Sequence, residues 1–559
     1  MAVESTSRPL PAAARGRDSG PLDVLIVGAG FAGMYMLHRC RQLGFAAQVI
    51  EAGDDVGGTW YWNRYPGARC DVESLEYSYG FDQALQQEWE WTERFATQPE
   101  ILKYARHVSE RFDLRRDIRF NARVTQATLN AAGDSWSVRT SAVGDDADRS
   151  KNKESLTLQA RFLIMATGCL SSANLPDIKG RDSFRGATYH TGQWPHRQID
   201  FSGQRVAVIG TGSSAIQSIP LIAKQARELW VMQRTAAYSV PAHNAALKAE
   251  ETAAIKADYA GLRQRNAEMI SGFGSRVGRS DVSALAVSDA QLQAEFERRW
   301  SLGGLNFMGS FGDLMMDKRA NDLAAEFVRR KIATIVQDPQ KAALLAPKQI
   351  IGCKRLCVDT SYYQTFNLPH VHLLDIAEGG VQEITATGLC AAGRQIEVDA
   401  IVFATGFDAM TGSLNKIDIR GRNGLSLRDK WRAGPLNYLG LSVAGFPNLF
   451  TITGPGSPSV LTNMIVSIEQ HVRWIGDCLA WMRAQGRQRI EATELAESNW
   501  VKHVNAVAGS TLFPSCNSWY LGANVPGKTR VFMPLLGFPP YARHCAEVAA
   551  RGYEGFALS

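Results

Sequence analysis

The sequence predicts an α/β protein with two parallel-sheet units and a helical insertion, and three patterns indicate this fold class. Two apolar, β-branched runs, at 23–27 and 205–209, each lead into a glycine-rich turn. Two further apolar runs, at 161–168 and 400–408, each carry Ala-Thr-Gly where the strand ends, as buried parallel strands of such folds can. Residues 242–346 are rich in Ala, Glu, Gln, Lys and Arg, which favours helices.

Both glycine-rich turns have the G-x-G-x-x-G/A spacing of a dinucleotide-binding turn. The first Gly permits a tight turn, the second lets the backbone approach a pyrophosphate, and the third position lets helix and strand pack closely. One copy would be weak evidence, but two strand-flanked copies predict two Rossmann-like dinucleotide-binding domains. The turn residues are Gly28, Gly30 and Gly33 in the first copy and Gly210, Gly212, Ser213, Ser214 and Ala215 in the second.

The two copies differ at the end of their second strand, where the side chain faces the adenosine ribose. Glu51 ends the first copy, and a carboxylate there accepts hydrogen bonds from ribose hydroxyls and repels a 2′-phosphate. Arg234 ends the second copy, with Thr235 beside it, and a guanidinium suits a phosphate. The first site therefore fits FAD or NAD and the second fits NADP, which together predict a flavin reduced by NADPH. An Arg234 that only caps a surface strand is the alternative.

Composition excludes several other classes of protein. The chain of 559 residues is 45% apolar and 21% charged, and its net charge of +6 is spread along the sequence, which argues against a nucleic-acid partner. No apolar run approaches the roughly 18 residues of a membrane span. The nine cysteines are dispersed without a C-x-x-C pair, which excludes disulfide-reductase chemistry and indicates a reducing cytoplasm.

No metal site is expected either. Cys353 and Cys357 have no His or Cys neighbours at zinc-site spacing. His370 and His372 lie on one face of an expected strand, but no carboxylate or third His is close in sequence.

The stretch between the two turns carries a motif that resembles the fingerprint of Baeyer–Villiger monooxygenases. In "FRGATYHTGQWP" the matching residues are Phe184, Gly186, His190, Trp194 and Pro195. N-oxidising flavin monooxygenases share the start of this motif but lack its Trp-Pro ending. A second stretch, "GTWYWNRYPGARCD", with Gly58, Trp60 and Asp71, resembles the other signature of the family. The resemblance covers about residues 22–558 and is closest to the phenylacetone and steroid monooxygenase branch.

The resemblance implies an NADPH- and O2-dependent enzyme that converts ketones to esters or lactones through a C4a-peroxyflavin. Such chemistry develops negative charge on oxygen, which a fixed cation stabilises, and Arg suits this better than Lys because it keeps its proton. By motif position that cation is Arg355 in "GCKRLC". Asp71 resembles the acid that pairs with it, and Lys354 resembles a second contact to the NADP phosphate. A purely structural ion pair is the alternative for Arg355 and Asp71.

Further roles follow from the same resemblance. Trp60 lies along the flavin, although it could be a core residue, and Trp519 belongs to a mobile loop that reaches NADP and substrate. His190 is interpreted as a hinge or positioning residue rather than a proton-transfer group. The loop before an expected helix resembles the substrate-pocket lining of the family, through Ser459, Val460, Leu461 and Met464.

These landmarks divide the chain into four parts. The FAD-binding part is expected to resume with the second Ala-Thr-Gly strand. Within the insertion, Ser288 and Gln291 form an expected capping box. The stretch 143–155 is interpreted as a surface hairpin tip. The expected parts are a loose tail at 1–20, an FAD domain at 21–168 and 399–559, an NADP domain at 169–241 and 347–398, and a helical insertion at 242–346.

Two other functions stay open at this point. One is a flavin monooxygenase that oxygenates nitrogen or sulfur, and the other is a non-catalytic sensor that binds FAD and NADP. The expected partners are a small ketone and O2, with no nucleic acid and no membrane. The sequence gives no signal for oligomeric state, and a monomer is the expectation. It does not indicate which ketone is preferred.

Overall fold

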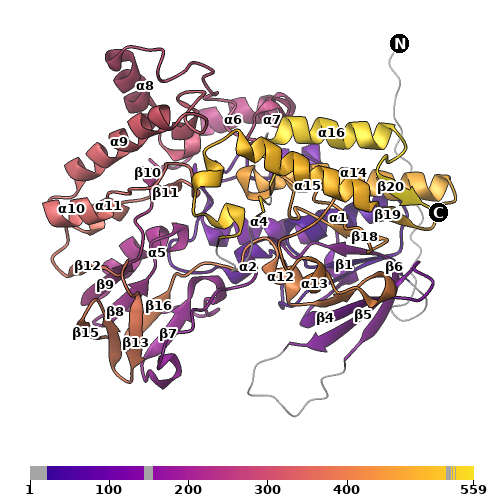
Figure 1. Ribbon diagram of the computed structural model, residues 1–559, viewed down its shortest axis with the longest axis horizontal. Helices are drawn as coiled ribbons and strands as arrows, with labels where there is room; N and C mark the ends of the chain where they lie inside the picture. The colour runs from indigo at the N-terminus through magenta and orange to yellow at the C-terminus, as the bar shows by residue number, and fades with distance from the viewer. Residues whose placement is uncertain (1–21, 144–154, 524–529, 532, 536) are drawn as a thin grey trace.

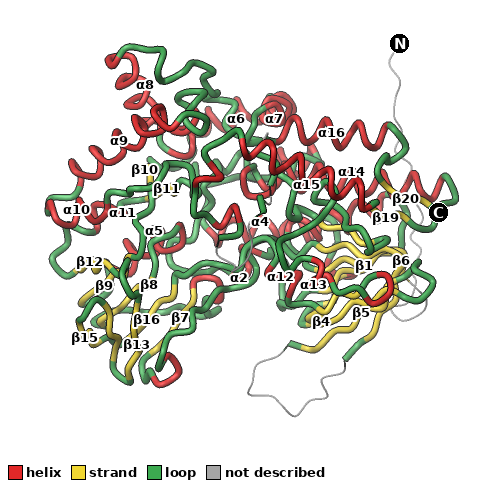
Figure 2. The backbone as a smooth tube through the Cα atoms, viewed as in Figure 1, coloured by secondary structure: helices red, strands yellow, loops and turns green. Residues whose placement is uncertain are grey.

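The computed structural model describes residues 22–143, 155–523, 530–531, 533–535 and 537–559, and it places two separate sheets on either side of a central region (Figures 1 and 2). The expected tail at 1–20 and nearly all of the expected hairpin tip at 143–155 lie outside the described residues. Helices of the C-terminal part cover the first sheet, and the helical insertion lies above the second sheet in Figure 1.

The first sheet carries the first glycine-rich turn. Its strands have the order β17-β4-β5-β6-β1-β2-β3, and β18 pairs with β6. The central strand β1 is nearly inaccessible to solvent from Val24 onward and pairs in parallel with both β2 and β6. Its strands are β1 (Leu22–Val27), β2 (Ala47–Ile50), β3 (Ile118–Arg119), β4 (Ala122–Leu129), β5 (Trp136–Ala142), β6 (Thr157–Met165), β17 (Asp418–Arg420) and β18 (Leu449–Thr451).

Helix α1 (Phe31–Gln42) follows the first turn and packs against α14 (Met464–Ala484), a helix from the far end of the chain. Both helices turn a continuous set of buried side chains toward the core that they share with β1. This packing explains why residues near both ends of the sequence form one unit.

The second sheet has the order β12-β9-β8-β16-β7 and is parallel throughout. Its strands are β7 (Ala187–His190), β8 (Arg205–Ile209), β9 (Glu228–Gln233), β12 (Val371–Asp375) and β16 (Ala400–Phe403), and α5 (Ser213–Ala223) follows the second turn.

One expectation about this sheet is corrected. The second Ala-Thr-Gly strand was expected to return to the first unit, but β16 pairs with β8 and β7. The chain rejoins the first sheet only at β17 and β18. A buried apolar strand has the same sequence pattern in either sheet, so the pattern could not assign it.

The helical insertion leaves and re-enters the second unit through two short parallel strands, β10 (Ser239–Pro241) and β11 (Cys357–Asp359). Ser288 and Gln291 form the capping box that the sequence predicts at the start of α8. In α9, Phe327 and Ile332 are buried and Leu323 is exposed. The helices of the insertion are α6 (Ala249–Ala257), α7 (Tyr259–Glu268), α8 (Asp289–Leu302), α9 (Lys318–Ile335) and α10 (Pro339–Leu345).

The remaining elements connect or cover these units. A small antiparallel sheet joins β13, β14 and β15, and β19 pairs with β20 near the C-terminus. No helix among the described residues is long and apolar enough to cross a membrane. The bounds are α2 (Thr59–Trp62), α3 (Gln83–Glu88), α4 (Gln98–Arg111), α11 (Tyr362–Thr365), β13 (Val381–Thr385), β14 (Gly388–Ala391), β15 (Arg394–Glu397), α12 (Gly412–Asn415), α13 (Leu427–Lys430), β19 (Ile490–Ala492), α15 (Glu494–Gly509), α16 (Phe538–Ala550) and β20 (Phe556–Leu558).

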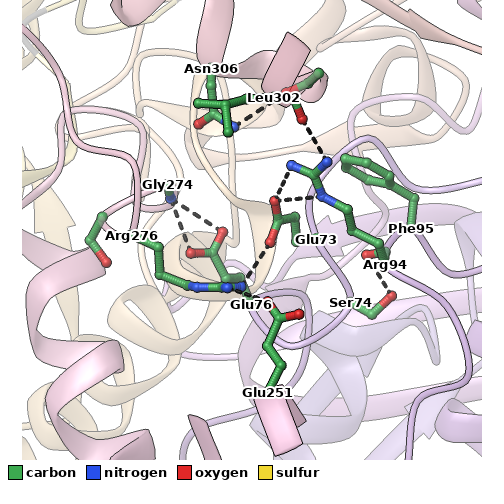
Figure 3. Close-up of polar contacts among 12 residues, drawn as sticks. Glu73, Ser74, Glu76, Arg94, Phe95, Glu251, Gly274, Arg276, Leu302 and Asn306 are labelled. Carbon is green, nitrogen blue, oxygen red and sulfur yellow. Dashed lines mark hydrogen bonds and ion pairs between the residues drawn. The ribbon is translucent and has the colours of Figure 1, made fainter. Parts of the chain in front are cut away.

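A polar network fastens the insertion to the segment that follows Asp71 (Figure 3). The Arg94 guanidinium donates to Glu73 Oε1 from Nε at 2.9 Å and from Nη2 at 2.6 Å, and to the carbonyl of Leu302 at 2.7 Å. Arg276, from the insertion, pairs with Glu73 Oε2 at 3.3 Å. Glu73 therefore holds one arginine from each unit, and this fixes the backbone next to Asp71.

Glu76 lies in the same network and is almost fully buried. Both of its carboxylate oxygens accept from the N–H of Gly274, each at 3.2 Å. Burial, reinforced by the charge of Glu73, raises the pKa of Glu76 to about 7.

Glu76→Gln should change how stability depends on pH. Since the folded pKa lies above the ordinary value, the folded protein retains a proton between pH 4.5 and 7 that the unfolded chain loses. Stability contributed by this group is therefore present at low pH and lost as pH rises through 7. Relative to wild type, the variant should gain about 1–3 kcal/mol of unfolding free energy between pH 5 and pH 8 in urea titrations. Glu110→Gln, an exposed position on α4, is the control, and an equal gain at both pH values would contradict the assignment.

Candidate active site

A cleft of about 2600 Å³ runs between the two sheets and reaches both glycine-rich turns. Drug-sized pockets measure roughly 300–1000 Å³, so this cleft has room for more than one large ligand. Among the residues that line it are Gly28, Gly30, Glu51, Gly210 and Gly212. The two predicted nucleotide sites therefore open into one space.

In both turns the first glycine is required by the strand that carries Ala-Thr-Gly. Gly28 has φ +103°, and a Cβ there would lie 2.6 Å from the carbonyl oxygen of Ala166. Gly210 has φ +115°, and its Cβ would lie 2.4 Å from the carbonyl oxygen of Ala404. Each Ala-Thr-Gly strand thus presses its backbone against a turn, which leaves the turn's own N–H groups near the cleft.

Glu51 ends β2 at the first turn and is 5% exposed. Its Oε2 accepts from the N–H of Ala29 at 2.6 Å, and its Oε1 accepts from the N–H of Gly53 at 2.7 Å. Burial raises the pKa of Glu51, and these backbone donors oppose that shift. The carboxylate is held against the turn and lines the cleft, where the first site requires it.

Arg234 and Lys354 form a pair of cations at the second site. Arg234 is exposed, and both side chains line the cleft. Burial lowers the pKa of Lys354, and the charge of Arg234 lowers it further. Among the described residues no carboxylate forms an ion pair with either of them. Two adjacent cations that lack an acidic partner there suit a ligand phosphate.

Arg355 and Asp71 meet, as the resemblance implies, although 284 residues separate them. Arg355 Nε donates to Asp71 Oδ2 at 2.6 Å and Nη2 donates to Oδ1 at 2.8 Å, so the pair is bidentate. Nη1 donates to the carbonyl of Val460 at 2.6 Å. Burial opposes the charge of Arg355, but Asp71 outweighs it and raises the pKa of the guanidinium above its ordinary value.

Tyr520 is a neighbour of Arg355 to which the sequence assigned no role. It is buried, and burial raises the pKa of its hydroxyl to about 12, while Arg355 opposes that shift. Its ring lies 4.3 Å, centroid to centroid, from that of Trp519, which lines the cleft. The only signal in the sequence was its position next to Trp519.

The other signature residues take structural positions around the cleft. Trp60 is buried against the cleft, and its Nε1 donates to Tyr77 Oη at 3.1 Å. Gly58 packs directly on Gly30, where an added Cβ would lie 2.9 Å from the Cα of Gly30. Both glycines therefore keep the backbone close at the point where a dinucleotide would bind.

The fingerprint residues surround the end of β7. His190 is buried, burial lowers its pKa, and its Nδ1 accepts from the N–H of Gly192 at 2.9 Å. A Cβ on Gly186 would lie 2.4 Å from the carbonyl of Asp399. Ser214 donates to Thr191 Oγ1 at 3.0 Å, which ties the second turn to this segment. The other fingerprint residues lie nearby. Phe184 is partly buried against the second sheet, and Trp194 is buried beside Tyr189. Pro195 lines the cleft.

Two of the four expected substrate-lining residues are placed elsewhere. Val460 and Met464 line the cleft. Ser459 is fully buried, and its hydroxyl lies 3.3 Å from the carbonyl oxygen of Thr453, to which it donates. Leu461 packs in an apolar cluster and is not part of the cleft lining. The short turn at Ser459–Leu461 points successive side chains in different directions, which the sequence did not reveal.

The cysteines give one further correction. The dispersed cysteines suggested no pairing, but the structure joins Cys353 and Cys516 in a disulfide. The two residues are 163 positions apart, so no local spacing could indicate the bond.

His370 and His372 belong to no metal cluster, since the described residues contain no group of three potential ligands.

Comparisons with known proteins agree with this geometry. Residues 25–257 match the family model described as pyridine nucleotide-disulphide oxidoreductase. A protein named Baeyer-Villiger monooxygenase from Pseudooceanicola batsensis is 39% identical over 536 residues, which is 95% of each chain. The chain belongs to the Baeyer–Villiger monooxygenases. The predicted fold class, the NADPH-dependent oxygenation of ketones and the cofactors FAD and NADP are thereby confirmed at the level of the family.

Two further relatives define how far this family similarity extends. A solved steroid monooxygenase bound to NADP is 48% identical, with a TM-score of 0.89 over 96% of this chain and 99% of that one. A protein named phenazine N-monooxygenase from Lysobacter antibioticus is 39% identical over 548 residues, 97% of this chain and 98% of its own. The monooxygenase fold and its two nucleotide sites therefore extend over nearly the whole chain.

Arg234→Ala tests the phosphate site of this monooxygenase. Loss of one charge-assisted contact should weaken NADPH binding by about 1.5–3 kcal/mol, while NADH binding changes little because it lacks the 2′-phosphate. The affinities are measured by titration of the purified protein with each nucleotide. A variant that keeps the wild-type preference between NADPH and NADH would remove the assignment.

Proposed function

We propose that Arg355 stabilises the negative charge that develops on oxygen while a ketone is converted to an ester or lactone, and that Asp71 positions Arg355 for this role. The observation that carries the proposal is the bidentate pair between Arg355 and Asp71 at the wall of the cleft that both nucleotide turns reach. A permanent cation in a site that excludes water is worth more than the same cation in bulk solvent.

The chemistry of the guanidinium fits this task. Its proton is not lost, so Arg355 cannot act as a base or deliver a proton to the reacting oxygen. Asp71 and Val460 accept three of its five N–H donors and fix its plane. Because Asp71 lies just before the segment that Glu73 holds in place, the position of Arg355 depends on both the first unit and the insertion.

The cofactors are assigned to the two turns. Gly28, Gly30 and Gly33 would hold the FAD pyrophosphate, with Glu51 toward the ribose and Trp60 along the flavin. Gly210, Gly212, Ser213 and Ser214 would hold the NADP pyrophosphate, with Arg234, Thr235 and Lys354 toward the 2′-phosphate. When bound, FAD would supply the hydride acceptor for NADPH and the group that activates dioxygen.

The substrate is proposed to be a ketone with an apolar body. Val460 and Met464 present apolar surface to the cleft near Arg355, and Trp519 lines the same cleft. His190, held by Gly192 in the fingerprint, is proposed to position the second unit rather than transfer protons.

We also propose how the chain divides. The FAD part comprises 22–168 and about 408–559, and the NADP part comprises 169–241 and 347–407, because β16 belongs to the second sheet. The insertion at 242–346, all of it within the described residues, contributes no residue to the cleft lining and is proposed to support the site through the contacts of Arg276 and Leu302 near Glu73. A monomer in the cytoplasm remains the expectation from the sequence.

Arg355→Ala separates the proposed role from cofactor binding. The variant should still oxidise NADPH and release hydrogen peroxide, while ester formation falls by about 100-fold or more. The measurement is coupled NADPH oxidation, peroxide release and product analysis over a panel of apolar ketones. Arg330→Ala, at an exposed position of α9, is the control and should form ester at the wild-type rate.

Two outcomes would contradict the proposal. Near wild-type ester formation by Arg355→Ala would show that the cation is not required. Because one relative is named an N-monooxygenase, the panel also includes an aromatic amine and a thioether. Oxygenation of these without any ketone conversion would favour nitrogen or sulfur oxygenation instead.

A further inference from the structure

We propose that Cys353 and Cys516 are a reversible oxidation site, at which hydrogen peroxide joins the segment of Lys354 and Arg355 to the loop that carries Trp519. The inference rests on the proposed function in one respect, because peroxide is the by-product expected when oxygen is reduced without a ketone. Formation of the disulfide would thereby report how far NADPH oxidation is uncoupled from ester formation.

The geometry of the two cysteines permits the bond without backbone movement. Their Cα atoms lie 5.6 Å apart, within the range of 4.4–6.8 Å found for disulfides. Both side chains are buried, at 4% and 7% exposure. The structure therefore accommodates the bonded state at this position.

The bond connects two segments that both line the cleft. On one side, Lys354 and Arg355 directly follow Cys353. On the other side, Asn517 directly follows Cys516, Trp519 lies three residues after it, and both line the same cleft. Closing the bond therefore fixes the distance between two parts of the site. One part is the segment of Lys354, the proposed phosphate contact, and Arg355, the proposed charge-stabilising residue; the other is the Trp519 loop.

Noncovalent contacts also hold this loop. Phe513 and Tyr520 anchor it in an apolar cluster that includes Val460. The N–H of Leu512 donates to the carbonyl of Met315 at 2.9 Å. Cys516 lies between Phe513 and Tyr520 in the sequence, and its disulfide adds a covalent link from the loop to Cys353, the residue before Lys354.

The position also distinguishes this pair from the redox centre of a disulfide reductase. Neither cysteine is part of the cleft lining, whereas the residue that follows each of them, Lys354 and Asn517, is. A flavin in the cleft would therefore not contact the sulfur atoms. A small oxidant released into the cleft has only one layer of residues to cross.

The chemistry balances with peroxide as the sole oxidant. One thiolate attacks an oxygen of hydrogen peroxide, so an S–O bond forms, the O–O bond breaks and hydroxide leaves. The second thiol then attacks that sulfur, so the S–S bond forms and water leaves. Two thiols lose two electrons and two protons, and one peroxide becomes two waters. A small dithiol reverses the step.

The expected consequence is tighter retention of NADP in the oxidised state. With the bond closed, the Trp519 loop cannot move away from Lys354, so release of the nucleotide requires a larger rearrangement. Reduction should therefore raise the Kd for NADP+ by about five-fold or more, the lower end of typical coupling between sites.

The test compares the FAD-loaded enzyme after treatment with hydrogen peroxide and after treatment with dithiothreitol. Mass spectrometry of peptides without reduction should find Cys353 linked to Cys516 only in the first sample. NADP+ titration without turnover then gives the Kd in each state. This readout does not use ester formation, so it fails or succeeds independently of the role of Arg355.

Variants sharpen the result. Cys353→Ser, Cys516→Ser and the double variant should all show the Kd of the reduced enzyme and no response to peroxide. Cys390→Ser, a free cysteine on β14, is the matched control and should keep the full response. If a variant loses FAD, the comparison of the NADP+ Kd between the oxidised and the reduced wild-type enzyme still tests the proposal. No linked peptide after peroxide, or equal NADP+ affinity in both states, would overturn the proposal.

Discussion

The ion pair between Arg355 and Asp71 is the contact on which the arrangement of the site depends. It joins the segment that follows the insertion to the loop of the first unit, and both carboxylate oxygens take part. Each side chain is about one quarter exposed, so the pair is neither a surface contact nor fully desolvated. Removal of either partner leaves a charge in a poorly solvated wall, which is costly, and this favours keeping both.

The two nucleotide sites reach this pair with opposite local charge. Glu51 is held against the first turn by backbone N–H groups, and we propose that its carboxylate makes that site reject a 2′-phosphate. Arg234 and Lys354 lie together at the second site, where their mutual repulsion is relieved only by an anion. Arg355 follows Lys354 directly, so binding of the NADP phosphate and positioning of the guanidinium share one short segment. In the proposed assignment, selection of NADPH and stabilisation of oxygen charge are therefore structurally linked.

Much of this could be predicted from the sequence because the chemistry imposes it locally. A turn that binds phosphate through its backbone requires glycine where a neighbouring carbonyl group approaches it closely. The carbonyl of Ala166 approaches Gly28 in this way, and the carbonyl of Ala404 approaches Gly210. The identity of the residue after the second strand likewise follows from the charge of the ligand. Each of these signals lies within one strand and the turn beside it, so it can be read from a single sequence.

The rest could not be predicted, for identifiable physical reasons. β16 was assigned to the wrong sheet because burial gives every central strand the same apolar pattern. Ser459 and Leu461 were expected in the pocket, but the direction of a side chain in a short turn is set by tertiary packing. The bond between Cys353 and Cys516, and the place of Tyr520 beside Arg355, depend on loops brought together from distant parts of the chain.

A crystal structure of the enzyme with FAD and NADP+ tests the central claim most directly. The expected result is a flavin in the cleft with its reacting edge beside the Arg355 guanidinium, Asp71 still paired with that group, and the 2′-phosphate between Arg234 and Lys354. A guanidinium turned away from the flavin, with the phosphate bound elsewhere, would contradict the account.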